Sequence, residues 1–237
     1  MKKAVIILSG GLDSSTTLYI AKSEEYELYA LTFKYGQRHS KEIECATEIG
    51  YQAGVMEHRY VELPTPRGSA LTDNIEVPTG RNLEELSIEV PPTYVPARNT
   101  LFIAYALQYA EEIGAESIFI GITAVDASPY PDTRPEYIDA YQNLIDKATK
   151  QTTSGSPIKL KVPLLHLYKS EIIEIGMSLG VDYSKTWSCY QGGEVPCLQC
   201  DTCKLRIKGF IEADLKDPSV SEDRWEKVLM DVKEGKL

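Results

Sequence analysis

Short apolar runs alternate with segments of helical periodicity along most of the chain. Runs of this length, with little polar alternation, are typical of strands buried on both faces of a parallel sheet. The predicted strands are Ala4–Leu8, Leu28–Phe33, Tyr60–Leu63, Ser117–Ile122 and Leu160–Leu164.

Between these strands, apolar residues recur at the spacing of one helix face. One stripe comprises Ile172, Ile175, Gly176 and Leu179, and another comprises Tyr137, Ile138, Tyr141, Leu144, Ile145 and Ala148. The segment from Leu101 to Ile113 is apolar nearly all round, which predicts a helix enclosed in the core rather than lying on the surface. The alternation predicts an α/β fold whose parallel β-sheet is sandwiched by helices.

The alternation stops between Pro64 and Thr93, a segment that contains five prolines. Connections this long without regular structure are uncommon in a compact domain unless they act as lids or binding loops. A lid loop over residues 64–93 and a surface insertion are both compatible with the pattern. A second change of character follows Trp187, where the chain becomes cysteine-rich and then helical. We therefore predict an α/β domain over residues 1–185 and a small C-terminal segment over residues 186–237.

Charge narrows the classes of partner. The chain of 237 residues has 25 Lys and Arg against 35 Asp and Glu, a formal net charge of -10. Nucleic-acid binding draws most of its affinity from basic residues that neutralise phosphates, so no nucleic-acid partner is expected. The first apolar run is too short for a signal peptide, and no stretch approaches the ~20 apolar residues that cross a membrane. The expected location is cytoplasmic, without membrane contact.

Glycine and hydroxyl side chains are concentrated directly after the first predicted strand, in the string Ser9-Gly10-Gly11-Leu12-Asp13-Ser14-Ser15-Thr16. Glycines let the backbone approach an anion, hydroxyls can donate to phosphate oxygens, and the start of a helix supplies free N–H groups. The string predicts a phosphate-binding loop. It is neither a Walker A loop nor a G-x-G-x-x-G fingerprint, and a plain strand-to-helix turn with helix-capping residues is the alternative.

Four of the five cysteines, Cys189, Cys197, Cys200 and Cys203, fall within fifteen residues, while Cys45 stands alone in a helical pattern. An odd count and tight clustering in a cytoplasmic chain favour a metal site over disulfides. Four thiolates suit one structural Zn²⁺. An iron–sulfur cluster is the alternative, although the fourth cysteine of ferredoxin-type strings lies downstream rather than upstream.

The glycine- and serine-rich string resembles the pyrophosphate-binding loop of the N-type ATP pyrophosphatases, or PP-loop enzymes. These enzymes cleave ATP between its α and β phosphates and transfer AMP to an oxygen of the substrate. The resemblance implies an adenine nucleotide α-hydrolase-like, Rossmann-like sheet and adenylation chemistry. It places ATP at Leu8, Ser9, Gly10, Gly11, Leu12, Asp13, Ser14, Ser15, Thr16, Thr17 and Leu18.

Further strings make the resemblance more specific. In chain order they are Phe33-Lys34-Tyr35-Gly36-Gln37-Arg38-His39, Tyr94-Val95-Pro96-Ala97-Arg98-Asn99, Gly121-Ile122-Thr123-Ala124-Val125-Asp126, Tyr130-Pro131-Asp132-Thr133-Arg134-Pro135-Glu136, Lys169-Ser170-Glu171 and Thr186-Trp187-Ser188-Cys189-Tyr190. Together with the phosphate loop they resemble the 7-cyano-7-deazaguanine synthase family of queuosine biosynthesis, from about Lys3 to Phe210.

That resemblance implies an ATP-dependent carbon–nitrogen ligase that converts 7-carboxy-7-deazaguanine and ammonia to 7-cyano-7-deazaguanine through adenylated intermediates. It implies catalytic roles for Asp13, Arg98 and Lys169, with Asp13 a candidate ligand of Mg²⁺. Asp132 and Arg134 are the candidate substrate contacts. The chain has Pro129 and Thr133 where the family commonly has Gly and Cys. A homodimer is expected, and His39 is given no role.

Two other functions are compatible with the same motifs. A PP-loop enzyme that thiolates tRNA would use the cysteines for sulfur relay or an iron–sulfur cluster, but the acidic balance disfavours tRNA binding. A nucleotide-sensing module without catalysis is the third possibility. Turnover of ATP to AMP and diphosphate would exclude it.

Overall fold

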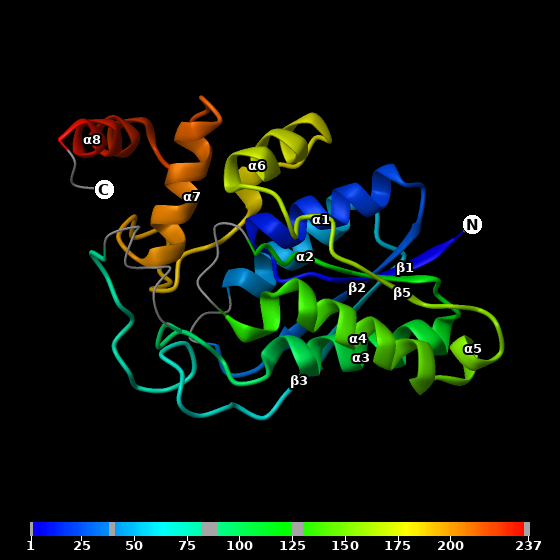
Figure 1. The fold of residues 1–237 in the computed structure, drawn as a ribbon. Coiled ribbons are helices and arrows are strands. Elements are labelled where there is room, and N and C mark those ends of the chain that lie inside the picture. The colour runs from blue at the N-terminus through cyan, green and yellow to red at the C-terminus, as the bar shows by residue number, and fades with distance from the viewer. Residues whose placement is uncertain (1, 38–40, 82–89, 125–129, 235–237) are drawn as a thin grey trace.

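A computed structural model describes residues 2–37, 41–81, 90–124 and 130–234. Within them, five strands form one parallel sheet in the order β3-β2-β1-β4-β5 (Figure 1). The strands are β1 (Lys3–Ile7), β2 (Glu27–Lys34), β3 (Glu57–Glu62), β4 (Ser117–Ile120) and β5 (Lys159–Lys161). All five predicted strands are confirmed, with ends shifted by up to three residues, and so is the parallel α/β fold.

Helices cover both faces of the sheet, as Figure 1 shows. One face carries α1 (Leu12–Ser23), α2 (Lys41–Ala53) and α6 (Lys169–Ser178), and the other carries α3 (Arg98–Ile113) and α4 (Pro135–Ala148). The central strand β1 serves both layers, because alternate side chains of a strand point to opposite faces. Ala4 and Ile6 pack on the first side, and Val5 and Ile7 on the second.

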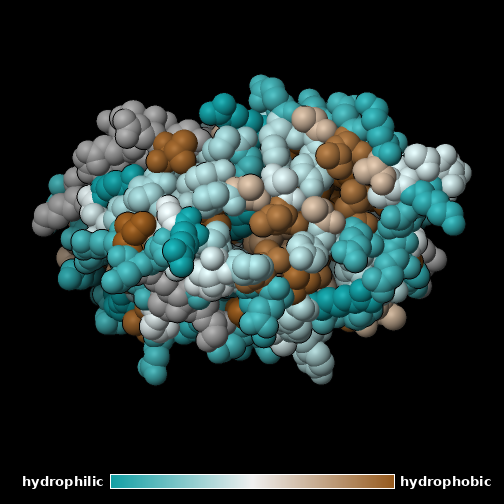
Figure 2. Space-filling model, turned by 90° about the horizontal axis from the view of Figure 1, so that it is seen from below, coloured by the Kyte–Doolittle hydropathy of each residue, from teal (hydrophilic) through white to brown (hydrophobic). Residues whose placement is uncertain are grey.

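The prediction that Leu101–Ile113 is enclosed on all sides is wrong. In α3, Phe102, Ile103 and Ala106 are buried against the sheet, but Leu101 and Tyr105 are exposed. The helix is the outer layer of the fold, so only one of its faces meets the core. Figure 2 views the molecule from below the orientation of Figure 1 and shows apolar side chains near the middle of this face.

The C-terminal segment packs onto α6 through α7 (Asp201–Glu212), and α8 (Glu222–Lys233) follows. Ile207, Phe210 and Trp225 join the same apolar cluster as Ile172 of α6, so this segment shares the core of the sheet domain. The short elements α5 (Lys150–Thr153), η2 (Pro131–Thr133) and η3 (Tyr183–Lys185) complete the described chain. No helix in this described part is long and apolar enough to cross a membrane.

A buried arginine joins α7 to the loop that follows it and to the segment that precedes it. The guanidinium of Arg206 donates to both carboxylate oxygens of Asp217, at 2.6 and 2.9 Å. Its remaining N–H groups donate to the hydroxyl of Thr186 and the carbonyl oxygen of Tyr183. Because each charge is buried and hydrogen-bonded, the pair fixes the position of the segment that leads into the cysteine cluster.

Candidate active site and metal centre

The phosphate loop lies at the C-terminal end of β1 and runs directly into α1. Gly10 has φ of +81°, the left-handed region that glycine tolerates best. A Cβ at Gly10 would overlap the carbonyl oxygen of Glu42 and the amide nitrogen of Ala46 in α2. Glycine is therefore required here for two independent reasons, conformation and space.

We expect Gly10→Ala to lower the free energy of unfolding by about 2 kcal/mol, because left-handed strain and overpacking add. That corresponds to roughly 4–8 °C in thermal unfolding of a chain of this size. Gly11→Ala is the matched control, since its Cβ would find its nearest neighbours at 3.4 and 3.5 Å. Equal melting points for the two variants would contradict this account of the loop.

Hydroxyl groups converge at the loop. The Ser9 and Ser14 hydroxyl oxygens are 3.0 Å apart, the Gly11 N–H donates to Ser9 Oγ at 3.3 Å, and Ser15 Oγ donates to the Gly11 carbonyl oxygen. Gly11 is the N-cap of α1, and no side chain caps the helix there. A helix start without a side-chain cap presents N–H groups and a positive dipole end to an anion. The arrangement fits the predicted phosphate loop better than a plain capping turn.

Asp13 and Lys169 form an ion pair at the edge of this loop. Lys169 Nζ donates to the two carboxylate oxygens of Asp13 at 2.7 and 2.8 Å. Lys169 is the first residue of α6, and 11% of its side chain is exposed, against 30% for Asp13. The fold thus brings together two predicted catalytic residues from distant parts of the chain, with the carboxylate still open to solvent.

A cavity of about 300 Å³ opens beside the loop. From the predicted ATP-binding window, its lining includes Leu8, Ser9, Gly11, Leu12, Asp13 and Ser14. Gly10, Ser15, Thr16, Thr17 and Leu18 are not among the lining residues, and the last four are buried. The hydroxyl of Thr16, for example, meets the Tyr183 hydroxyl at 2.7 Å inside the protein. The face of α1 that contacts the cavity therefore ends at Ser14.

Arg98 lies on the cavity wall with a group of aromatic and acidic side chains. It is the first residue of α3 and follows Ala97, whose φ of 52° is left-handed. The lining also includes Tyr35, Glu42, Tyr130 and Tyr190. Burial acts to lower the pKa of Arg98. The surrounding tyrosine hydroxyls, among them the Tyr35 hydroxyl that accepts a hydrogen bond from Arg98, outweigh burial and hold the pKa above its ordinary value. The guanidinium therefore stays charged.

Asp132 and Arg134, the predicted substrate contacts, are not among the residues that line this cavity. Asp132 is buried in η2, where its carboxylate accepts from the Asn99 N–H and its carbonyl oxygen accepts from Asn99 Nδ2. These bonds hold the first turn of α3, and with it Arg98. Arg134 is exposed at the N-cap of α4, whereas Tyr130 and Thr133 line the cavity. The contacts with substrate stay a prediction for both residues.

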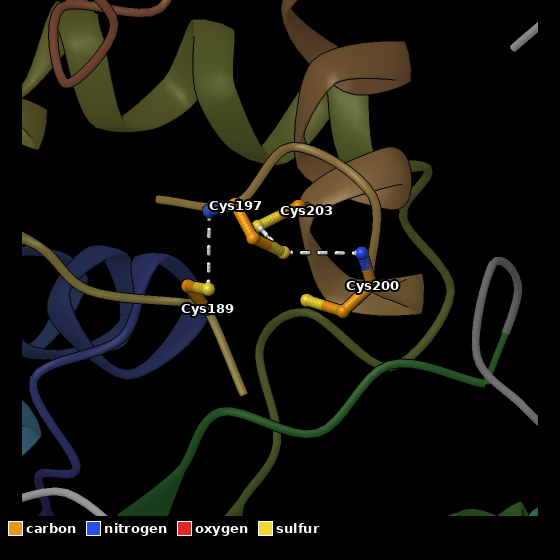
Figure 3. A group of neighbouring side chains, drawn as sticks. All are labelled: Cys189, Cys197, Cys200 and Cys203. Atoms are coloured by element: carbon orange, nitrogen blue, oxygen red, sulfur yellow. Dashed lines mark hydrogen bonds between the residues drawn. The ribbon is translucent and has the colours of Figure 1, made fainter. Parts of the chain in front are cut away.

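The four clustered cysteines converge on one point. Figure 3 shows their side chains meeting between the loop that contains Cys189 and the start of α7. All four sulfur atoms lie within 4.8 Å of one another. The sulfur of Cys197 accepts from the N–H groups of Gln199 and Cys200 at 3.4 and 3.3 Å. Four convergent thiols with N–H donors to sulfur fit a tetrahedral Zn²⁺ site with no open position.

The cysteine cluster contacts both the phosphate loop and the proline-rich segment. The backbone N–H of Trp187, two residues before Cys189, donates to the Gly10 carbonyl oxygen at 2.9 Å. Thr79 forms an antiparallel bridge with Cys200, and Arg81 forms an ion pair with Asp201. Residues 79–81 are thereby anchored to the cluster. A lid over residues 64–93 stays a prediction, and residues 82–89 lie outside the described part.

Reasoning from motifs missed part of this wall. Tyr35 and Tyr130 belong to strings that had been singled out, yet no role was given to them, and Glu42 lies beyond any string. The only sequence signal near Glu42 is the helical pattern around Cys45, which predicts a helix that contains both residues. Arg38, His39, Asp126 and Pro129, which also occur in or beside those strings, lie outside the described residues.

Comparisons with known proteins agree on one family. A sequence model described as "Queuosine biosynthesis protein QueC" matches residues 3–214. The 7-cyano-7-deazaguanine synthase of Trichodesmium erythraeum (strain IMS101) is 52% identical over 219 residues, 91% of this chain and 99% of that protein. The protein of the same name from Syntrophus aciditrophicus (strain SB) is 53% identical over 227 residues, 93% of this chain and 98% of that protein.

Among solved structures, the NMN synthetase from Francisella tularensis matches with a TM-score of 0.47 and 17% identity, over 93% of this chain and 79% of that one. A likeness at that level supports no conclusion about function.

A parallel sheet in the order β3-β2-β1-β4-β5, with a glycine- and hydroxyl-rich loop at the end of its central strand, defines a doubly wound α/β protein. Within that class, the chain belongs to the QueC family of queuosine biosynthesis proteins.

Proposed function

We propose that this protein converts 7-carboxy-7-deazaguanine, ammonia and ATP to 7-cyano-7-deazaguanine, with release of AMP and diphosphate. The observation that carries the proposal is the shared cavity. The predicted phosphate loop and Arg98 line the same cavity. The chain is also about half identical, over nine tenths of its length, to proteins named 7-cyano-7-deazaguanine synthase.

Adenylation explains why one cavity serves both an acid and a nucleotide. Oxide is a poor leaving group, so a carboxylate resists attack by ammonia until AMP is attached to it. Removal of the oxygen from an amide meets the same obstacle, and a second adenylation overcomes it. Because an acyl-adenylate hydrolyses in water, the acid and the nucleotide must meet in an enclosed site.

On the nucleotide side, we assign the diphosphate portion of ATP to the loop, in which Ser9, Gly11, Asp13 and Ser14 line the cavity and Gly10 and Ser15 shape the backbone behind them. The loop N–H groups and hydroxyls would donate to phosphate oxygens, and Lys169 and Arg98 would offset charge that builds up in the transition state. Asp13 fits Mg²⁺, because its carboxylate is a hard oxygen donor that faces the cavity. When bound, Mg²⁺ would neutralise phosphate charge.

The cysteine cluster has a structural role in this proposal. Zn²⁺ held by Cys189, Cys197, Cys200 and Cys203 would contribute folding energy to the segment that carries Trp187 and α7. We propose one Zn²⁺ per chain and no direct part for it in the chemistry, because four thiol ligands leave no position for substrate.

Three further expectations belong to the same proposal. The first is that the protein is a homodimer in the cytoplasm. The second is that it has no nucleic-acid partner. The third is that the chain divides into residues 1–185 and 186–237, with a lid over residues 64–93. Light scattering of the purified protein tests the dimer. Limited proteolysis with and without ATP and the acid tests the lid, which we would abandon if cleavage within 64–93 were unchanged.

The decisive experiment is mass spectrometry of the reaction of purified protein with 7-carboxy-7-deazaguanine, ATP and ammonium. We expect the nitrile, AMP and diphosphate, with the amide as a transient species. Production of ADP, or no nucleotide turnover with the acid present, would exclude the proposal. Zinc rather than iron in the same preparation would exclude an iron–sulfur thiolation enzyme.

A further inference from the structure

Glu42 is a carboxylate in the cavity to which no role has yet been given. It is the second residue of α2, and its carbonyl oxygen lies where a Cβ on Gly10 would overlap it. The Glu42 backbone therefore lies against the phosphate loop, and Glu42 lines the same cavity as Asp13 and Arg98. The cavity in which we propose that the acid is activated is therefore also lined by Glu42.

The surroundings of Glu42 are unusual for a structural carboxylate. Among the described residues, no hydrogen bond or ion pair to its carboxylate is found, whereas the two other acidic side chains that line the cavity are paired, Asp13 with Lys169 and Asp201 with Arg81. The charged and titratable groups around it are Arg98 from α3, Tyr35 after β2, Tyr130 before η2, Tyr190 after Cys189, and Cys45 on α2 itself.

Burial raises the pKa of the Glu42 carboxyl to about 7, and the charge of Arg98 opposes that rise without cancelling it. A carboxyl group with this proton affinity exchanges its proton readily at neutral pH, which is the property that suits a general base. A carboxylate whose task is to anchor an ion pair would instead be held ionised, as a close cation lowers the pKa.

The proposed function requires a proton acceptor. Ammonia is present in neutral water almost entirely as ammonium, whose nitrogen has no free electron pair. We propose, on the basis of the proposed function, that Glu42 is the catalytic base that takes a proton from ammonium in the cavity and so delivers ammonia to the acyl-adenylate.

The step balances as follows. Ammonium gives one proton to the Glu42 carboxylate, and the freed nitrogen pair forms a bond to the acyl carbon. The carbon–oxygen bond to AMP breaks, and AMP leaves with the electron pair. The nitrogen loses a second proton to solvent, which yields the neutral amide. Glu42 then returns its own proton to solvent.

A carboxylate in this position has one strong competing role, recognition of the N–H edge of the deazaguanine ring. The two roles differ in what they require. An edge contact affects the binding of the acid and hence its adenylation, whichever nucleophile follows. A base for ammonium is needed only after adenylation, and only when the nucleophile arrives protonated.

The test compares Glu42→Gln with wild type in three reactions: acid-dependent exchange of diphosphate into ATP, amide formation with ammonium, and hydroxamate formation with hydroxylamine, which is neutral at pH 7. We expect E42Q to keep exchange and hydroxamate formation within a few fold, and to lose amide formation by roughly 10²-fold or more. Glu44→Gln is the matched control, because Glu44 is exposed on the same helix.

The pH profile gives a second readout that a purely structural role would not move. Because the base must be ionised, amide formation by wild type should fall as the pH drops below about 7, while hydroxamate formation at saturating hydroxylamine should lack this dependence. If E42Q does not fold, Glu42→Asp replaces it. We expect this variant to shift the pH at which amide formation falls, and to slow the reaction with ammonium but not the reaction with hydroxylamine.

Three results would overturn the proposal. The first is amide formation by E42Q at the wild-type rate. The second is an equal loss of diphosphate exchange, amide and hydroxamate in E42Q, which indicates an edge contact. The third is a pH profile of amide formation whose fall at low pH is unchanged by Glu42→Asp. Failure of the proposed function is distinguishable from these, because wild type itself would then show no acid-dependent exchange, and the assignment of Glu42 would fall with it.

Discussion

Asp13→Asn should lower acid-dependent release of diphosphate by roughly 10²–10³-fold, because Lys169 and any bound Mg²⁺, the cations that would offset negative charge on the phosphates, lose the carboxylate that positions them. The carboxylate oxygens of Asp13 face the cavity and are bound by Lys169 at 2.7 and 2.8 Å. The amide has one oxygen and no charge. It would weaken both the hold on Lys169 and any bond to Mg²⁺.

Rates of diphosphate release, measured at several Mg²⁺ concentrations, check this prediction. Asp139→Asn is the control, since Asp139 is exposed on α4, on the opposite face of the sheet. Zinc content and melting temperature of D13N should match those of wild type, because the side chain lies in the cavity and not in the core. A rate within threefold of wild type would remove Asp13 from the catalytic machinery.

Cys200→Ser should strip the protein of its metal and lower the melting temperature by more than about 10 °C, because structural zinc binding is also folding energy. The effect should spread beyond the cluster. Cys200 bridges Thr79 in the proline-rich segment, and Trp187, two residues before Cys189, holds the Gly10 carbonyl oxygen. Loss of metal therefore loosens the phosphate loop, and diphosphate release should fall as well.

Elemental analysis, thermal unfolding and the rate of diphosphate release measure these effects. Cys45→Ser is the matched control, because Cys45 packs against the cluster without belonging to the four convergent thiols. We expect it to keep one zinc per chain and a melting temperature close to that of wild type. Retention of full metal by C200S would show that the cluster does not hold zinc through all four cysteines.

Much of the fold and site was predictable because the signals are local. The strand β1 and the start of α1 follow from an apolar run that ends at two glycines, and the spacing of the four cysteines predicts a cluster of thiols that the structure confirms. The phosphate loop could be found for the same reason, since its hydroxyl groups and helix start lie within eight residues. Homology later confirmed the family that these strings resemble.

Other parts could not be predicted from local pattern. The segment from Leu101 to Ile113 reads as apolar nearly all round, yet Leu101 and Tyr105 are exposed, because the layer in which a helix lies depends on the whole sheet. Asp132, for which a contact with substrate stays a prediction, holds the start of α3 through Asn99, which its position after a strand did not reveal. A carboxylate after a strand can do either, and only its neighbours decide which.

By itself the sequence determined the α/β fold, the glycine- and hydroxyl-rich turn after β1 and the four-cysteine cluster, since each depends on periodicity or on residues a few positions apart. Only the tertiary structure decided that Lys169 pairs with Asp13, that the cysteine cluster touches Gly10 through Trp187, and that Glu42 shares a cavity with Arg98. Contacts between residues so distant along the chain exist only once the sheet has assembled, because their geometry is set by packing and not by spacing.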